Sequence, residues 1–287
     1  MSKIVIVTDS NSGLLQEDAD RLGVKIVPMP FYIDDTEYFE NINLSQNEFY
    51  DKLEKGAVIH TSQPSPEFVM NLWSDLLKEY DEVVYIPMSS GLSSSCQTAK
   101  MLMEDYDGKV QVVDNQRISV TMIHSIYDAL KMIEEGKNAS EIREYLENDK
   151  ANSSIYITLD TLSYLKKGGR ITPAAAALGT ILKIKPVLQI QGDKLDEFAK
   201  ARTISSAKTL MLNAIKEDIE GRITDNGKYG FTISVAHTCN PDVADSLKEE
   251  IQSMFPECKD IIIASLPLSV SCHIGPGSFA VAASRKY

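Results

Sequence analysis

Paired cysteines are the feature that this sequence most clearly lacks. Its four cysteines form no CxxC pair, and they share no spacing with the four histidines of the kind that metal ligands have. Cysteines scattered through a chain of 287 residues are typical of reduced thiols in a cytosol. We therefore expect neither a metal site nor a disulfide framework.

Long hydrophobic runs are also missing. The longest apolar stretch, residues 173–184, is too short to cross a bilayer. The first ten residues, MSKIVIVTDS, resemble neither a signal peptide nor a membrane anchor, because an aspartate follows the short run IVIV. We expect a soluble protein of the cytoplasm with no stable membrane insertion.

Positive charge is in short supply, and it is unevenly distributed. The formal net charge is −12, and residues 1–150 hold 13 basic and 27 acidic side chains, whereas residues 151–287 hold 16 and 14. An acidic chain lacks the cations that neutralise nucleic-acid phosphates or anionic membrane surfaces. A local basic excess does exist in residues 160–210, with nine Lys or Arg against four Asp or Glu. We expect no nucleic-acid partner.

The first half of the chain alternates strand-like and helical patterns. Residues 3–9 and 24–33 are typical of buried strands, and a short helix is expected between them. Residues 45–56 and 65–80 predict further helices, the second with proline in its first turn. This alternation is typical of a parallel sheet covered by helices, so we predict an N-terminal, Rossmann-like α/β domain over residues 1–152.

The second half has a different pattern. The polar segment DKANSS (149–154) is loop-like, and we place the domain boundary in it. Residues 185–202 predict a hairpin turned by Gly192-Asp193, residues 241–254 a helix, and residues 260–270 a strand. We therefore predict a C-terminal α+β domain over residues 153–287.

A serine-rich loop, PMSSGLSSSCQ (87–97), stands where the strand EVVYI (82–86) gives way to a helix. At the carboxyl edge of a parallel sheet, such a loop presents free amides and the positive end of a helix. Ser93 or Ser94 would then donate a hydrogen bond to a carboxylate or a phosphate. The alternative is that these serines only cap the helix and satisfy a turn.

Two further functions stay open for this loop. No Gly-Lys-Ser/Thr follows it, so it is not a phosphate-binding Walker loop. The stretch from Gly91 resembles a nucleophile elbow without its second glycine, and the chain order Ser93, Asp160, His273 is that of an α/β-hydrolase triad. A serine hydrolase of the esterase type, using Ser93 and His273, therefore remains an alternative. A binder of a phosphorylated metabolite is a third.

Two other segments carry polar side chains in constrained loops. TSQPSP (61–66) places Thr61 and Ser62 in a loop that its two prolines force to be extended. SCHIGPGSFAV (271–281) places His273 before a Gly-Pro-Gly turn, where a backbone can approach a ligand closely. A lone histidine is usually structural, and we favour that role for the other three histidines.

Taken together, five segments of this chain resemble the DegV family. They occur in family order from one end of the chain to the other: VTDS (7–10), TSQPSP (61–66), PMSSGLSSSCQTA (87–99), LDTLSYLKKGGRI (159–171) and SCHIGPGSFAV (271–281). The resemblance extends to the fatty-acid-binding subunit of the bacterial fatty acid kinase. It implies two α/β domains that hold a long-chain fatty acid in a tunnel between them, and a separate ATP-dependent kinase subunit that converts the carboxylate to an acyl-phosphate.

The same resemblance assigns roles to individual residues. Thr61, Ser93 and His273 would bind the carboxylate, and Arg170 and Arg202 would contact the kinase partner or the transferred phosphoryl group. The secondary candidates at the head group are Ser62, Ser94, Gly277 and Ser278. The resemblance implies a carrier with no catalytic site, cofactor or metal of its own.

The energetics of a fatty acid agree with this interpretation. Burying ~15 methylenes at about 0.8 kcal/mol each offers roughly 12 kcal/mol before the costs of binding. A carboxylate opposes burial unless several donors receive it. Neutral hydroxyls and a histidine would hold the head group and still leave it accessible to another protein.

Overall fold

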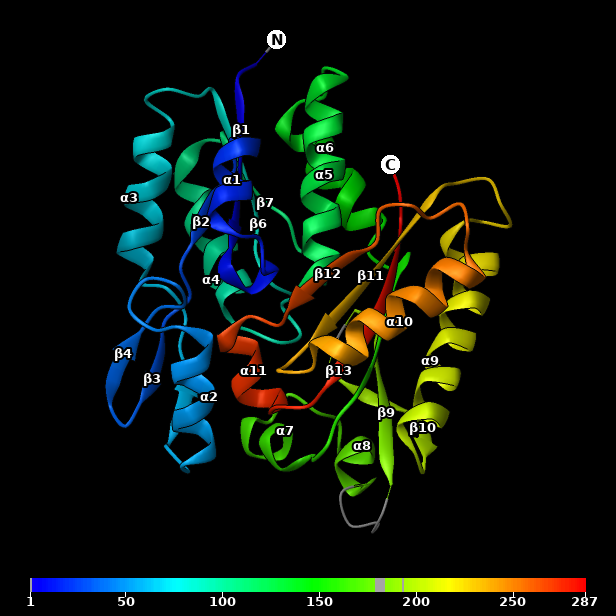
Figure 1. The fold of residues 1–287 in the computed structure, drawn as a ribbon. Helices are drawn as coiled ribbons and strands as arrows, with labels where there is room; N and C mark the ends of the chain where they lie inside the picture. Colours follow the sequence, from blue (N-terminus) through cyan, green and yellow to red (C-terminus); the bar gives the residue numbers. More distant parts are fainter. Residues whose placement is uncertain (1, 179–183, 193) are drawn as a thin grey trace. The chain divides into compact units, whose positions relative to one another are not determined.

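The computed structural model describes residues 2–178, 184–192 and 194–287 (Figure 1). The chain forms two compact units, Met1–Lys150 and Ala151–Tyr287. The fold class expected from the sequence is confirmed: the first unit is built on a parallel sheet and the second on a mixed one. A functional domain boundary after residue 152 stays a prediction.

The first unit alternates strands and helices as the sequence pattern indicates. Its elements are β1 (Ile4–Asp9), η1 (Ser10–Ser12), α1 (Gln16–Leu22), β2 (Lys25–Val27), β3 (Phe31–Ile33), β4 (Thr36–Tyr38), α2 (Gln46–Glu54), β5 (Ile59–Thr61), α3 (Pro66–Leu76), β6 (Glu82–Ile86), α4 (Ser95–Leu102), η2 (Met103–Tyr106), β7 (Val110–Val112), α5 (Val120–Glu134) and α6 (Ala139–Asn148).

The main sheet of the first unit has the strand order β2-β1-β6-β7, with every pair parallel. The chain leaves β1 toward β2 on one side and leaves β6 toward β7 on the other. The order therefore reverses between β1 and β6, and such a switch point opens a crevice at the carboxyl ends of the strands. Buried strand residues pack with Trp73 of α3 and Cys96 of α4 in one apolar core.

Prolines correct one expectation in this unit. Residues 24–33 were expected to form a single strand, but they form β2 and β3, which belong to different sheets. Pro28 and Pro30 lie between them, and neither can donate the amide that a sheet ladder needs. β3 instead pairs antiparallel with β4 and β5 in a small three-stranded sheet.

The second unit contains both sheet types. Its described elements are β8 (Ser153–Thr158), α7 (Ser163–Gly168), α8 (Pro173–Ala177), β9 (Lys185–Ile190), β10 (Asp196–Ala201), α9 (Ile204–Asp218), the π-helical turn η4 (Ile219–Ile223), β11 (Phe231–His237), α10 (Pro241–Met254), β12 (Ile262–Ser265), α11 (Leu268–Ile274) and β13 (Phe279–Arg285).

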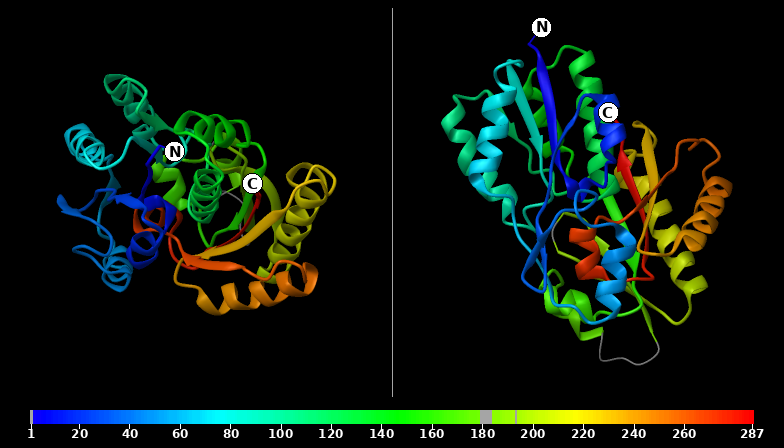
Figure 2. Two further views of the ribbon diagram at one scale, coloured as in Figure 1. Left: turned by 90° about the horizontal axis from the view of Figure 1, so that it is seen from above. Right: turned by 60° about the vertical axis from the view of Figure 1, so that its left-hand side comes forward.

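The sheet of the second unit has the order β10-β9-β8-β13-β11-β12, antiparallel except for the parallel pair β11–β12. The long helices α9 and α10 lie along this sheet (Figure 2). Their apolar faces and the inward strand residues form one core around Met211, Ile215, Leu247 and Val281. The predicted hairpin is confirmed as β9–β10, although Asp193 of its expected turn lies outside the described residues.

A second correction concerns the segment before His273. Residues 260–270 were expected to form a strand, but β12 ends at Ser265 and α11 begins at Leu268. Pro267 immediately precedes the helix, where its missing amide costs nothing and its fixed φ suits the helix start. His273 consequently lies on a helix. Among the described residues, no helix is long and apolar enough to cross a membrane.

Candidate functional site

Asp9 joins the two loops that flank the switch point of the parallel sheet. It ends β1, and its carboxylate accepts hydrogen bonds from the backbone amides of Asn11 (2.9 Å) and Met88 (2.8 Å), the latter in the loop after β6. Complete burial raises the pKa of Asp9 to about 6, although the two amides act in the opposite direction. This carboxylate therefore links the end of β1 to the beginning of the serine loop.

The serine loop is held by hydrogen bonds of its own. The Ser89 amide donates to the Arg117 carbonyl (2.9 Å), and the Ser93 amide donates to the Ser89 carbonyl (3.1 Å). The Ser93 hydroxyl accepts from the Ser95 amide at 3.2 Å and shares a 2.9 Å hydrogen bond with the Ser95 hydroxyl. Ser94 is the N-cap residue of α4, but its exposed side chain makes no capping bond.

These bonds support the local capping role of Ser93, but they do not use all the hydrogen-bonding positions of its hydroxyl. A serine hydroxyl has one donor and two acceptor positions, so Ser93 retains capacity for a ligand. A nucleophile elbow places its serine in a strained backbone conformation. Ser93 is not among the described non-glycine residues with positive φ. Its backbone therefore lacks the strain that the hydrolase interpretation would favour.

The loop after β5 approaches the same helix. Thr61 ends β5 and pairs with Phe31, and the Ser62 amide donates to the Pro30 carbonyl (3.1 Å). The Gln63 side-chain oxygen accepts from the Thr98 hydroxyl of α4 at 3.1 Å. The structure thus joins the segment that carries Thr61 and Ser62 to the helix that follows Ser93 and Ser94.

In the second unit, His273 packs directly against a glycine. A Cβ atom on Gly168 would collide with the His273 ring, so only glycine leaves room for this imidazole. Arg170 donates to the Gly168 carbonyl at 2.5 Å and lies close enough to influence the histidine. Burial, assisted by the Arg170 charge, lowers the pKa of His273 to about 4. The ring is therefore neutral at pH 7.

The Gly-Pro-Gly turn after His273 is fastened to the end of β11. The Thr238 hydroxyl donates to the Gly275 carbonyl (2.7 Å) and accepts from the Ser278 amide (2.9 Å). The Asn240 side chain donates to the Gly277 carbonyl (3.0 Å). Gly277 has φ +81°, and a Cβ atom there would meet Asp160. The turn therefore has one well-defined path, and glycine is required in it.

Ser278 has a hydroxyl with unused capacity. The residue is 0% exposed, and its Oγ has no hydrogen-bond partner among the described residues. A buried hydroxyl without a partner costs about 1–3 kcal/mol, so such an atom in a native site indicates a ligand or a water. Ser278 is thus a stronger candidate than its place among the secondary residues suggested.

The remaining predicted residues are less closely connected. Arg202 is exposed and precedes Thr203, the N-cap of α9. Asp160, the acid of the hydrolase alternative, forms an ion pair with Lys185. Thr61, Ser62, Ser93 and Ser94 belong to the first unit, whereas Arg170, His273, Gly277 and Ser278 belong to the second. Their action on one ligand stays a prediction.

Sequence reasoning missed two residues that organise these sites. Asp9 lies inside the quoted VTDS segment, but its bond to Met88 spans 79 positions of the chain. Gly168 was part of the KKGGRI loop, and nothing in its neighbours along the chain indicates the packing against His273. In the part of the chain that the structure describes, no group of three or more His, Cys, Asp or Glu side chains could hold a metal ion.

Comparison with known proteins agrees with this architecture over the whole chain. A family model described as "Uncharacterised protein, DegV family" matches residues 3–286. A DegV domain-containing protein of Clostridium perfringens is 32% identical over 98% of this chain and 97% of its own. Two solved structures are similar throughout.

The first is a DegV family protein from Thermus thermophilus described as binding fatty acid; it is 29% identical with a TM-score of 0.90, over 99% of both chains. The second, a stearic-acid-binding protein from Eubacterium ventriosum, is 25% identical with a TM-score of 0.86, over 100% of this chain and 99% of its own. The match of the family model and the similarity to the full-length relative show that this chain belongs to the DegV family.

Proposed function

We propose that this protein binds one long-chain fatty acid and holds its carboxylate with Thr61, Ser93 and His273. The observation that carries the proposal is full-length similarity, at 25–29% identity, to solved structures described as fatty-acid-binding. Ser62, Ser94, Gly277 and Ser278 are secondary contacts to the same head group.

The chemistry of the two polar clusters supports this ligand. His273 is neutral at pH 7 because its pKa is lowered to about 4, so it offers an N–H donor without a full charge. The Ser93 hydroxyl keeps bonding capacity, and the Ser278 hydroxyl has no partner among the described residues. Neutral donors can stabilise a carboxylate while leaving the affinity to the apolar tail.

The biological role that we propose is that of a carrier. The protein presents the bound carboxylate, in the cytoplasm, to a separate ATP-dependent kinase subunit that forms the acyl-phosphate, and it has no catalytic site, metal or cofactor of its own. Arg170 and Arg202 are the cations that we assign to the kinase or to the transferred phosphoryl group, since guanidinium groups pair with acidic and phosphoryl oxygens.

The direct test is extraction of the purified protein with organic solvent, followed by mass spectrometry. We expect one fatty acid per chain, and saturable uptake of palmitate or oleate by stripped protein. Ser93→Ala and His273→Ala should weaken retention of the acid by about tenfold each, because each removes a hydrogen bond to a charged group. A protein that emerges empty and takes up neither acid contradicts the proposal.

Two controls separate this function from its alternatives. A serine hydrolase would turn over nitrophenyl esters and lose that activity with Ser93→Ala, whereas a carrier shows no turnover in either form. A binder of phosphorylated metabolites would respond to phosphate competition and not to acyl chain length. Arg170→Lys, matched to Arg170→Ala, tests whether charge or guanidinium geometry serves the kinase.

A further inference from the structure

The N-terminus of α5 lies beside the same switch point in the first unit. The Ser119 amide donates to the carbonyl of Asn11 (3.0 Å), in the loop after β1. Two residues earlier, the Arg117 carbonyl accepts from the Ser89 amide (2.9 Å) of the serine loop. The start of α5 is thus bonded to both loops at the switch point, although no sequence motif pointed to it.

Ser119 itself has an unusual backbone. Its φ of 55° and ψ of −137° lie in a region that L-residues rarely adopt and that glycine tolerates. Holding a non-glycine residue there costs of the order of 1–3 kcal/mol. Serine therefore occupies a position whose backbone conformation glycine would adopt more easily.

The Ser119 hydroxyl makes no hydrogen bond that would explain why serine occupies this strained position. The residue is only 4% exposed, it is the N-cap of α5, and its side chain forms no capping bond. Its Oγ has no hydrogen-bond partner anywhere in residues 2–178, 184–192 or 194–287. An N-cap hydroxyl normally accepts from the first turn, so this one is a buried polar atom with both donor and acceptor capacity unused.

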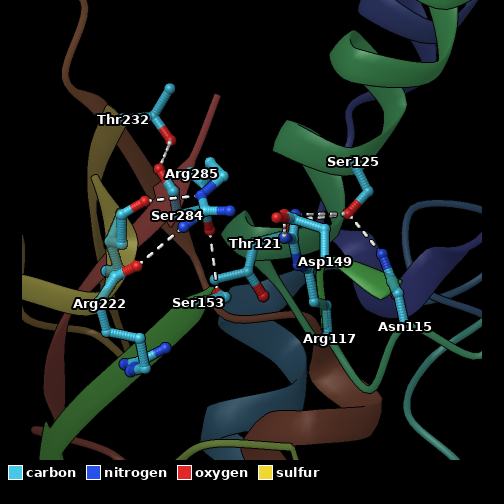
Figure 3. A network of polar contacts seen from close by, with 11 residues as sticks. Asn115, Arg117, Thr121, Ser125, Asp149, Ser153, Arg222, Thr232, Ser284 and Arg285 are labelled. Atoms are coloured by element: carbon cyan, nitrogen blue, oxygen red, sulfur yellow. Dashed lines mark hydrogen bonds and ion pairs between the residues drawn. The ribbon is translucent and has the colours of Figure 1, made fainter. Parts of the chain in front are cut away.

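The neighbouring hydroxyls differ from Ser119, because they are engaged within the protein. Thr121 Oγ1 donates to the Ile118 carbonyl at 2.7 Å. Ser125 Oγ donates to the Thr121 carbonyl (3.2 Å) and accepts from the Asn115 and Arg117 side chains at 2.7 and 3.0 Å (Figure 3). These hydroxyls have structural roles, so the unpartnered one is distinct within the same turn of chain.

The first amides of α5 complete a set of neutral donors. The first amides of a helix have no partner within the helix, and those of Val120 and Thr121 find no other backbone acceptor among the described residues. Both residues are 1% exposed, so bulk water does not satisfy them. Two amides at the positive end of a 15-residue helix, with a hydroxyl beside them, are donors of the kind that bind an anionic oxygen.

We propose that Ser119 and the first turn of α5 form an oxyanion subsite that receives one carboxylate oxygen of the bound acyl ligand. The proposal rests on the fatty-acid-binding function and adds a residue to its head-group site. It also defines a specificity: a free acid gains from this subsite, whereas an alcohol with the same chain, which carries no negative charge, gains little.

The test compares affinities for palmitate and hexadecanol at pH 7.5 in the full-length protein. Ser119→Ala should weaken palmitate binding about tenfold or more and change hexadecanol binding less than twofold, since a hydrogen bond to a charged group contributes more than one to a neutral group. Ser119→Gly should weaken palmitate equally while raising the melting temperature, because it relieves the backbone strain. Ser125→Ala is the matched control: it should lower the melting temperature and leave the ratio of the two affinities unchanged.

The outcomes distinguish a failure of the subsite from a failure of the proposed fatty-acid-binding function. Wild-type binding of palmitate with an unchanged palmitate-to-hexadecanol ratio in both Ser119 variants overturns the subsite and leaves fatty-acid binding intact. An equal loss of affinity for palmitate and hexadecanol also overturns the subsite, because the hydroxyl would then affect binding only through the packing of the protein. A wild-type protein that binds neither ligand overturns the proposed function and the subsite together.

Discussion

The two units bury polar groups by opposite means. In the first, some of the buried groups carry charge: Asp9 is 0% exposed, and Arg117 and Asp149 form a 2.7 Å ion pair at 2% and 5% exposure. In the second, His273 is neutral and Ser278 is a hydroxyl, while ion pairs such as Arg222–Asp218 stay partly exposed. One unit therefore depends on buried charges, and the other mainly on its apolar core.

Sheet topology explains this difference. All strands of the parallel sheet end at one edge, so the loops after β1, β6 and β7 converge and bring Asp9, Ser89 and Arg117 into one network. In the second unit, most neighbouring strands run in opposite directions, and the end of β8 lies beside the start of β13. Its polar site is therefore assembled from tight glycine turns and from a helix between strands.

The largest expected effect concerns the Arg117–Asp149 pair. Arg117→Met should lower the free energy of unfolding of the first unit by about 3–5 kcal/mol, because it leaves Asp149 charged and buried without its partner. The double variant Arg117→Met with Asp149→Leu should recover most of that loss, since no charge remains to be desolvated. Fluorescence of Trp73, the single tryptophan and fully buried in the first unit, reports the unfolding.

The matched change in the second unit is Arg222→Met. The Arg222 side chain is 32% exposed, and it donates to Asp218 (2.9 Å) and to the Ser154 hydroxyl (2.5 Å). Because water can solvate Asp218 after the change, we expect a loss of about 1 kcal/mol. Equal losses for the two arginine variants would break the comparison between the units.

The next effect is a pH dependence with opposite signs in the two units. The pKa of Asp9 is raised from 3.8 to about 6, so its stabilising contribution is complete below pH 3.8 and is lost as pH rises to 6. The pKa of His273 is lowered from 6.5 to about 4, so its contribution is complete above pH 6.5 and is lost as pH falls to 4. Each shift corresponds to about 3 kcal/mol at most.

Between pH 4 and 6, acidification should thus favour the first unit and disfavour the second. Denaturant unfolding followed by Trp73 fluorescence measures the first trend, and hydrogen exchange of α11 peptides, corrected for intrinsic rates, measures the second. Asp9→Asn should remove the first dependence, and His273→Gln the second. Parallel pH profiles in the two units would contradict the assigned pKa directions.

The sequence predicts local features of both units better than their long-range contacts. β1, the serine loop and α10 follow from hydrophobic runs, capping residues and prolines, which act over a few positions. The Asp9–Met88 bond and the Arg117–Asp149 pair join residues 79 and 32 positions apart, and no local pattern encodes them. The helix that carries His273 was missed because residues 261–270 are mostly apolar, a run that suits a strand and a buried helix equally.

The same limit applies within the candidate site. The motif segments indicate Ser93 and His273 because they contain chemically distinctive residues beside glycine turns. Ser119 has no such signal: its importance lies in a backbone angle and an unpartnered hydroxyl, which exist only in the folded chain. The absence of a hydrogen-bond partner in the folded chain cannot be recognised from the neighbouring residues in the sequence.

The most local effect on stability comes from two adjacent glycines of the second unit. Gly169 has φ +70° and open space around its Cα, so Gly169→Ala should cost about 1 kcal/mol through backbone strain alone. Gly168→Ala carries no such strain, but its methyl group collides with the His273 ring and should cost about 1–3 kcal/mol. The two variants therefore have similar stabilities and different causes.

The His273 pKa separates these causes. In Gly168→Ala the ring must move from its half-buried position, so its pKa should rise toward 6.5, whereas in Gly169→Ala it should stay near 4. NMR titration of the imidazole protons, assigned with His273→Gln, measures both values. If the pKa rises equally in both variants, contact with Gly168 is not what holds the ring. If it rises only in Gly168→Ala and fatty-acid retention falls with it, the absence of one methyl group keeps the histidine neutral and in place.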